Sequence, residues 1–334
     1  MFLFFISIFA LDLIQINGMN YMRKIKNYVL AYWKEDFHAG YYATVALFLA
    51  ISLFLNYRFK VGYNLYYMAM REKNPMVLVY NLFFYGGPYL FTMAAYGYFK
   101  KDWTWVYKKE FWIRLGVVLF VMDLVLGTWL HRPFAKALFD GNADRYYAML
   151  WFMSFKMHVF TLIPVGLYYY YKDKDLPFLY GLRLKGFDAK PYWIIAAIVL
   201  PTIFLVSFSP HFTGYYPICK PSEMKFVQFI SPFQATALYE ITYAGMYVWV
   251  EVLFRGFLVV GMAKVLGKNG VLPMVAMYCF IHFAKPAGEA STAIIGGYIL
   301  GILAYRTENI MGGVVLHITV AMGMEFFAMW QLMG

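Results

Sequence analysis

Long apolar runs separated by short polar stretches are the dominant pattern along this chain of 334 residues. A transmembrane helix needs about 20 mostly apolar residues to cross a hydrocarbon core about 30 Å thick. Runs of this kind predict helical spans or part-spans at approximately 41–57, 75–99, 112–130, 148–171, 192–209, 232–263, 271–284, 291–305 and 310–332. We therefore expect an all-α integral membrane protein, a multi-pass helical bundle of about eight transmembrane helices.

Three of the runs are not simple membrane spans. The run 232–263 is too long for one straight span, so it is either tilted or projects beyond the membrane. The runs 271–284 and 291–305 are short and are interrupted by Lys285 and Pro286. A helix can break at membrane depth only where the freed backbone lines a cavity or is buried in protein. The break therefore indicates part of a functional site.

The loop 172–191 is the main polar interruption. It separates residues 23–174, a set of N-terminal membrane helices, from a C-terminal core, residues 175–334. The positive-inside rule places this loop in the cytoplasm because it carries five basic residues, Lys172, Lys174, Arg183, Lys185 and Lys190. The basic loops 18–40, 100–110 and 264–270 then fall on the same side. Loop 58–74 is also basic, and this count places it outside.

Residues 1–22 are apolar but contain Asp12 and Gln15, and they lack the basic start of a secretory signal. We interpret this segment either as a weak first span or as an extension upstream of a natural start at Met19 or Met22. The second interpretation is slightly favoured.

Composition supports a membrane location and narrows the classes of function. The chain is 62% hydrophobic and 14% charged, whereas soluble domains are usually about 45–50% apolar and about 25% charged. The net charge is +11, but the basic residues flank apolar runs instead of forming a patch, which argues against nucleic-acid binding. The two cysteines, Cys219 and Cys279, predict neither a disulfide framework nor a Cys-rich metal site.

Three apolar segments near the C-terminus contain ionisable side chains. Each such group costs roughly 2.5–3.5 kcal/mol at the centre of a membrane helix. The set therefore needs either a functional role or very good pairing. Its members are Glu251 and Arg255 in the first segment, His282, Lys285 and Glu289 around the helix break, and His317 and Glu325 in the last segment.

Five of these seven side chains also have a structural explanation. Glu251 and Arg255 are spaced i, i+4 on one helix face, so an ion pair that fixes the helix is as reasonable as a functional pair. A lone buried histidine such as His282 is more often a hydrogen-bonded core residue than a ligand. Lys285 and Glu289 are i, i+4 partners that are more easily read as a cap on the broken helix end.

His317 and Glu325 lie eight residues apart in the last segment, so their directions on a helix differ by about 80° and they could edge one cavity. One glutamate and two histidines from three helices form the minimum set for polarising a water molecule. Glu251 could act as general base while His282 or His317 holds the water or stabilises an oxyanion. The same three side chains could instead bind Zn²⁺ with an open position. These residues leave metal-assisted and metal-free hydrolysis open.

About residues 175–332 resemble the CAAX-protease and bacteriocin-processing (CPBP, Abi) family of intramembrane proteases. Four motifs carry the resemblance in order: YGLRLKGFDAKPYW, EVLFRGF, FIHF and AIIGGYILGILAYRTENIMGGVVLH. The resemblance implies a bundle of eight-helix type with its active site inside the bilayer. It also implies cleavage of peptide bonds in prenylated or other membrane-associated substrates.

The family's usual motifs assign the site residues by position. Glu251 matches the second Glu of E-E-x-x-x-R and Arg255 matches its Arg, while His282 and His317 match the histidines of the second and third motifs. Two positions depart from the pattern. Val250 replaces the first Glu, the usual water-activating base, and Ala321 replaces the Asn of H-x-x-x-N that is thought to help the oxyanion.

The chain is similar to a bacterial subgroup with a single Glu before F-R-G, an H-F-x-K-P-x-x-E segment and an acidic residue after the last His. This similarity favours a coherent alternative site, with Glu251 as base and Glu289 or Glu325 as a second carboxylate. Residue 250 points about 100° away from residue 251 on a helix, so such a change of role needs a rotated helix.

We therefore expect an intramembrane endopeptidase in a prokaryotic plasma membrane that acts on a membrane-associated peptide or protein. Its expected catalytic residues, also the possible Zn²⁺ ligands, are Glu251, His282 and His317, supported by Arg255, Lys285, Glu289 and Glu325. An inactive relative that binds membrane peptides, as a chaperone or immunity factor, is the alternative that Val250 and Ala321 motivate. A transporter would also suit buried charges and a broken helix, but the chain shows no inverted repeat.

Overall fold

A computed structural model describes residues 19–333, and this part of the chain contains helices and no strand. The main helices are α2 (Met19–Asp36), α3 (Ala39–Phe59), α5 (Met76–Lys100), α6 (Lys109–Met122), α8 (Asn142–Lys172), α10 (Lys190–Ser207), α13 (Pro232–Glu251), α15 (Val271–Phe280), α16 (Ala287–Thr307) and α17 (Met311–Met333). The all-α, multi-pass fold that the sequence predicts is confirmed. Most of the predicted segment 1–22 lies outside the described residues.

Shorter helical pieces connect these elements. They are α4 (Val61–Tyr67), η2 (Met68–Glu72), η3 (Thr104–Tyr107), η4 (Asp123–Gly127), α7 (His131–Leu138), α9 (Phe178–Gly181), α11 (Pro210–Tyr215), α12 (Pro221–Met224), η5 (Val252–Gly261), α14 (Ala263–Leu266) and η6 (Gly267–Gly270). By length and composition, six helical elements of the described chain could cross a membrane, or seven if the bent pair formed by α6–η4 and α7 counts as one span. The number eight stays a prediction.

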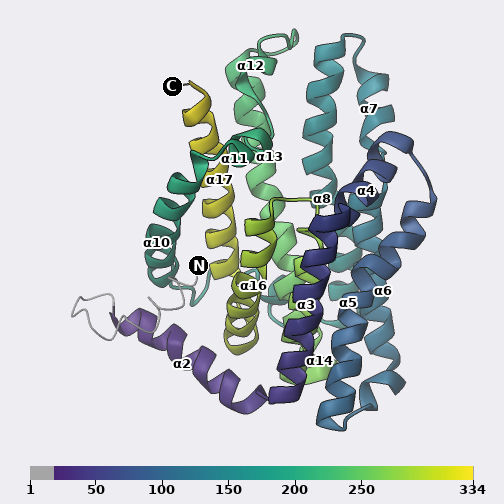
Figure 1. Ribbon diagram of the computed structural model, residues 1–334, viewed down its shortest axis with the longest axis vertical. Helices are drawn as coiled ribbons and strands as arrows, with labels where there is room; N and C mark the ends of the chain where they lie inside the picture. Colours follow the sequence, from purple (N-terminus) through teal and green to yellow (C-terminus); the bar gives the residue numbers. More distant parts are fainter. Residues whose placement is uncertain (1–18, 334) are drawn as a thin grey trace.

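Several basic loops meet at one end of the bundle, where α2 runs across the other helices (Figure 1). The Nζ atoms of Lys100 and Lys268 donate to the carbonyl oxygens of Asp36 and Glu35, each at 2.6 Å. Lys108 donates to the carbonyl of Val265 at 2.7 Å. The predicted loop 18–40 is mostly helix α2 in the structure, but α2 and the segments 100–110 and 264–270 share one side, as the charge pattern predicts. The cytoplasmic assignment of that side stays a prediction.

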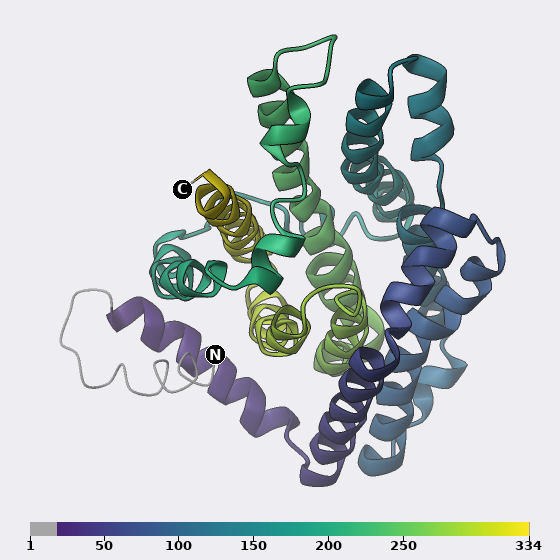
Figure 2. The same cartoon turned by 45° about the horizontal axis from the view of Figure 1, so that its top comes forward.

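The long run 232–263 forms one continuous helical element. It begins at Ser231, whose side chain accepts from the backbone N–H of Gln234 in a capping box that satisfies the free donors of the first turn. α13 then continues without interruption as the π-helix η5. All ten residues of η5 are buried. π-helical segments are rare and often mark functional sites. α13 packs along α8, and this contact joins the C-terminal core to the N-terminal helices (Figure 2).

α15 and α16 form a hairpin that enters and leaves the bundle at the same end. Lys268 before α15 and Arg306 near the end of α16 both contact Glu35. α15 has ten residues, about 15 Å of helix, half the thickness of a hydrocarbon core. The break between the helices is held inside the protein by α3, because the side chains of Asn56 and Tyr57 each donate at 2.9 Å to carbonyls of that break. This satisfies the rule for broken helices in membranes.

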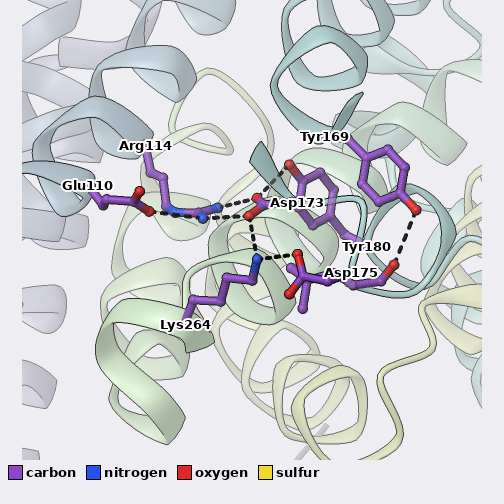
Figure 3. Close-up of polar contacts among 8 residues, drawn as sticks. Glu110, Arg114, Tyr169, Asp173, Asp175, Tyr180 and Lys264 are labelled. Atoms are coloured by element: carbon purple, nitrogen blue, oxygen red, sulfur yellow. Dashed lines mark hydrogen bonds and ion pairs between the residues drawn. The ribbon is translucent and has the colours of Figure 1, made fainter. Parts of the chain in front are cut away.

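A buried ion cluster also joins the N-terminal and C-terminal parts (Figure 3). Arg114 of α6 donates from both terminal nitrogens to Asp173, at 2.6 and 2.8 Å, and both side chains are fully buried. Lys264 of α14 and the hydroxyl of Tyr180 donate to the same carboxylate at 3.0 and 2.9 Å. Although burial acts to raise it, hydrogen bonds from Arg114 and Lys264 hold the pKa of Asp173 below its usual value.

Candidate active site

The predicted pair Glu251 and Arg255 lies in the bundle interior. Oε1 of Glu251 is 3.0 Å from Nη1 of Arg255, and the two side chains are 0% and 1% exposed. The guanidinium of Arg255 also lies over the ring of Tyr278, 4.0 Å from its centroid. An ion pair with this degree of burial compensates the charge of Glu251, because an isolated carboxylate would be strongly destabilised there.

Glu251 also contacts the last helix. Its Oε1 atom lies 2.9 Å from Nδ1 of His317, which joins the end of α13 to α17. Gly313, one turn before His317, allows this approach, since a Cβ atom at that position would lie 2.1 Å from Oε2 of Glu251. The carboxylate accepts from Nδ1–H in this geometry. The Nε2 atom of His317 therefore carries the free lone pair.

His282 follows the end of α15, where backbone carbonyls lose their helical partners. Its Nδ1 atom lies 2.8 Å from the carbonyl oxygen of Tyr278, so Nδ1 is the donor and Nε2 again keeps its lone pair. The ring of Tyr278 packs against both imidazoles, with centroid distances of 4.7 Å to His282 and 6.4 Å to His317. Both imidazoles are thus oriented by their neighbours.

The two imidazoles line one cavity of about 290 Å³. Lys285 and Val250 also line it, whereas Glu251 does not. Glu251 therefore contacts a cavity-lining residue, His317, but does not line the cavity itself. Of the two neighbouring side chains, Val250 is the one that faces the cavity. The rotation between neighbouring helical positions, about 100°, accounts for this difference. The rest of the lining is mostly apolar, including methionines and aromatic residues of α5, α8 and α13.

The other predicted residues divide into two groups. Lys285 lines the cavity and pairs with Glu289, which is not a lining residue and whose Oε2 atom accepts from the hydroxyl of Tyr216 at 2.7 Å. Glu325 is separate. It is fully buried, accepts from the backbone N–H of Ile218 at 2.9 Å and does not line the cavity. Ala321 does not line the cavity, but it packs in an apolar cluster with Tyr239, Tyr243 and Tyr247, which do.

The arrangement does not fit a zinc ion held by Glu251, His282 and His317. Within residues 19–333 no three His, Cys, Asp or Glu side chains are placed to hold a metal. Oε1 of Glu251 is shared by Arg255 and His317, and the carboxylate is absent from the cavity wall. Two imidazole nitrogens without a third donor fall short of a catalytic zinc site. Zn²⁺ stays a prediction of the sequence.

Buried ionisable residues of the N-terminal part were not singled out by the sequence pattern. Arg114 and Lys156 are 0% and 6% exposed, although each lies in an apolar run of ordinary appearance. An isolated Lys or Arg within such a run is the only signal that could have marked them. Their partners, Asp173 and the carbonyl of Thr128, are brought near only by folding.

Two oriented imidazoles and a lysine therefore line a mostly apolar cavity inside an all-α bundle, and a buried Glu–Arg pair lies behind one of the imidazoles. Residues 232–322 match the family described as type II CAAX prenyl endopeptidase Rce1-like. This match supports the assignment of the C-terminal core to the CAAX-protease (CPBP) family, and it includes Glu251, His282 and His317. Comparison with curated proteins and with solved structures gives no significant match.

Proposed function

We propose that this protein is an intramembrane peptide hydrolase of CAAX type that uses His317 as general base. The observation that carries the proposal is the contact between Glu251 and Nδ1 of His317, on the wall of the cavity that His282 also lines. Membership of a protease family supports the reaction class. A membrane-associated peptide is the substrate that a mostly apolar cavity suits.

The proposed division of roles follows from which groups face the cavity. Glu251 fixes the tautomer of His317 and stabilises the imidazolium that forms, as buried carboxylates do in Ser-His-Asp triads. Arg255 holds Glu251 in place by their ion pair. Glu251 is then a positioning residue, whereas the sequence predicted a base. The cavity-facing position next to it, Val250, has no group that could take a proton.

In the proposed reaction, water attacks the carbonyl carbon of the scissile peptide bond and gives its proton to Nε2 of His317. The oxyanion that forms is stabilised by Lys285. This ammonium group has three donor hydrogens and uses one of them in its hydrogen bond to Glu289. His282 holds the water through its free Nε2 atom. The imidazolium of His317 then protonates the leaving nitrogen, and the C–N bond breaks.

Val250 favours one alternative, an inactive relative that binds membrane peptides. It places an apolar side chain on the cavity wall where the family usually has its base. One experiment distinguishes hydrolysis from binding alone. Purified protein in bilayers is mixed with a membrane-anchored peptide, and binding and product release are both measured. The hydrolase releases product, and His282→Ala and His317→Ala each stop release without loss of folded protein. Binding by the wild type with no product, and equal binding by both variants, would support the alternative instead.

The prokaryotic plasma membrane is proposed as the location. It rests on the similarity to a bacterial subgroup and on the basic loops gathered at one end of the bundle. The orientation can be tested by labelling single-cysteine variants in the loop 172–191 with a thiol reagent that does not cross the membrane, in intact and in permeabilised cells. A cytoplasmic loop is expected to react only after the membrane is made permeable.

A further inference from the structure

A stripe of tyrosines on α13 forms one wall of the cavity at the candidate active site. Tyr239, Tyr243 and Tyr247 are spaced four residues apart, so they share one helix face, and all three line the cavity. Their side chains are buried in the bundle. The next position at the same spacing is Glu251, which contacts His317. The stripe therefore follows the cavity for about 12 Å of helix and ends beside the proposed base.

The hydroxyl groups of Tyr243 and Tyr247 form a hydrogen-bonded pair with a defined direction. The Tyr247 hydroxyl donates to the Tyr243 oxygen at 2.6 Å. A phenol has a single hydrogen to donate, so the hydrogen of Tyr243 needs an acceptor other than Tyr247. Within residues 19–333 no protein group accepts it. Because buried polar groups are rarely left without a partner, this donor indicates an acceptor that enters the cavity.

Tyr247 connects this hydroxyl pair to the residues of the proposed reaction. Its ring lies against His317, with 4.3 Å between the ring centroids. Lys285 lies within electrostatic range of the same phenol. The ring of Tyr243 packs edge-on against Tyr247, with 5.2 Å between centroids. A group that accepts from Tyr243 would therefore lie near both the proposed base and the proposed oxyanion donor.

The surroundings of the hydroxyl pair favour a neutral acceptor over an anion. The nearby cations are already paired, Lys285 with Glu289 and Arg255 with Glu251. The cavity wall is otherwise mostly apolar, and a few placed polar groups fix the orientation of a ligand in such a site. A peptide presents a carbonyl oxygen, a strong neutral acceptor, at every residue. Donation from Tyr247 also strengthens the hydrogen bond that Tyr243 can make, because hydrogen bonds in a chain polarise one another.

We propose that the Tyr243 hydroxyl donates a hydrogen bond to a backbone carbonyl oxygen of the peptide that occupies the cavity, and that Tyr247 aligns this donor. The proposal rests on the proposed function for the identity of the occupant. Tyr243 is then a substrate-binding residue and Tyr247 a positioning residue. Neither hydroxyl gives up its proton. The hydrogen bond holds the peptide against α13, the helix that also carries Glu251.

The test compares Tyr243→Phe with Tyr247→Phe in the whole chain, held in lipid bilayers. Both changes remove the same hydrogen bond within the protein, so both should lower the unfolding temperature by a similar amount. Only Tyr243→Phe also removes the donor to the peptide. The probe is a short hydrophobic peptide with an N-terminal acyl anchor, and its dissociation constant is measured by rapid mixing before product forms. Tyr243→Phe is expected to raise this constant about 2- to 12-fold, since a neutral hydrogen bond contributes about 0.5–1.5 kcal/mol. Tyr247→Phe is expected to raise it less.

A spectroscopic measurement identifies the accepting group. An isotopic carbon label at the backbone carbonyls of the peptide separates their infrared band from that of the protein, and a hydrogen bond shifts the band to lower frequency. The shifted component is expected with wild type and Tyr247→Phe, and it should be lost with Tyr243→Phe.

Three results would each overturn the proposal for Tyr243. They are equal dissociation constants for wild type and Tyr243→Phe, an equal loss of binding in both phenylalanine variants, and a carbonyl band that Tyr243→Phe leaves unchanged. Failure of wild type to bind the peptide would overturn it together with the proposed function. Because binding is read before cleavage, retained binding without product contradicts hydrolysis alone.

Discussion

Oε1 of Glu251 and Nδ1 of His317 lie 2.9 Å apart, although 66 residues separate them in the chain. The contact connects the last residue of α13, directly before the π-helix η5, with α17. It also connects a fully buried carboxylate with an imidazole on the cavity wall. Most of the chemistry proposed for this protein depends on that relationship, and the predictions below alter it or the features that support it.

Glu251→Gln is expected to lower cleavage about 10²- to 10⁴-fold, because the amide neither stabilises the imidazolium nor enforces the tautomer of His317. The same change leaves Arg255 buried without its counter-charge, at a cost of about 3–5 kcal/mol in stability. The double variant Glu251→Gln/Arg255→Gln separates the two effects. Thermal unfolding should recover in the double variant, while peptide cleavage should stay low. Recovery of cleavage together with stability would show that Glu251 acts only as a structural partner.

Val250→Glu is expected to place a carboxylate on the cavity wall, where the protein now has an apolar side chain. In the Glu251→Gln background it should restore part of the lost cleavage, because a cavity-facing carboxylate can itself take a proton from water. Val250→Gln has nearly the same size without the charge and serves as control. Product formation from a membrane-anchored peptide is the measurement. Equal rates for Val250→Glu and Val250→Gln would argue against this view of position 250.

Gly313→Ala is expected to disturb the Glu251–His317 contact directly, since its Cβ atom would lie 2.1 Å from Oε2 of Glu251. The carboxylate must move, so cleavage should fall by at least about tenfold, as small displacements of catalytic groups cost large factors in rate. Gly296→Ala on α16 has open space around the new Cβ atom and should cleave at the wild-type rate. Similar activity of both variants would contradict the tight approach at Gly313.

Asp173→Asn is expected to destabilise the protein by about 3–5 kcal/mol, because Arg114 then remains buried without its carboxylate. Asp175→Asn is the matched control. Asp175 contacts the same Lys264 but is largely exposed, so its loss should change the unfolding temperature little. Thermal unfolding of the two variants in detergent compares them. A similar small effect of both changes would show that the cluster in Figure 3 is not a stabilising connection.

The contribution of Asp173 to stability predicts that the unfolding free energy depends on pH. Its folded pKa is held below the usual value, so its stabilisation is fully present above the unfolded pKa, about 3.9, and is lost as pH falls through the folded pKa. The difference in unfolding free energy between wild type and Asp173→Asn should be constant from about pH 7 to pH 5 and shrink below about pH 4. A difference that instead grew on acidification would have the wrong sign for this account.

A strong chelator is expected to leave cleavage unchanged, because within residues 19–333 the cavity presents two imidazole nitrogens and no third metal ligand. Activity of the purified protein before and after chelation, combined with metal analysis, provides the test. Loss of activity on chelation with recovery on adding Zn²⁺ would require Glu251 to leave Arg255 and enter the cavity. The zinc prediction from the sequence would then replace the metal-free reaction.

The helices of the bundle were largely predictable, because apolar runs of about 20 residues have few other uses. The helix break near His282 and the pairing of Glu251 with Arg255 were also readable from local spacing. The orientation at positions 250 and 251 was harder. A helical wheel gives the angle between neighbours but not which of them faces a cavity. Glu325 accepts from the backbone N–H of Ile218, and Lys156 donates to the carbonyl of Thr128. Both contacts join distant segments, which spacing along the chain does not encode.

The most direct test of the central claim is chemical rescue of His317→Ala by imidazole. The variant removes the proposed base but leaves Glu251 and the cavity in place, so free imidazole can enter the space and accept the proton from water. Wild type is expected to cleave a membrane-anchored peptide, and His317→Ala to lose cleavage and regain a measurable fraction with added imidazole. Cleavage by His317→Ala at the wild-type rate, with no response to imidazole, would contradict the role assigned to His317.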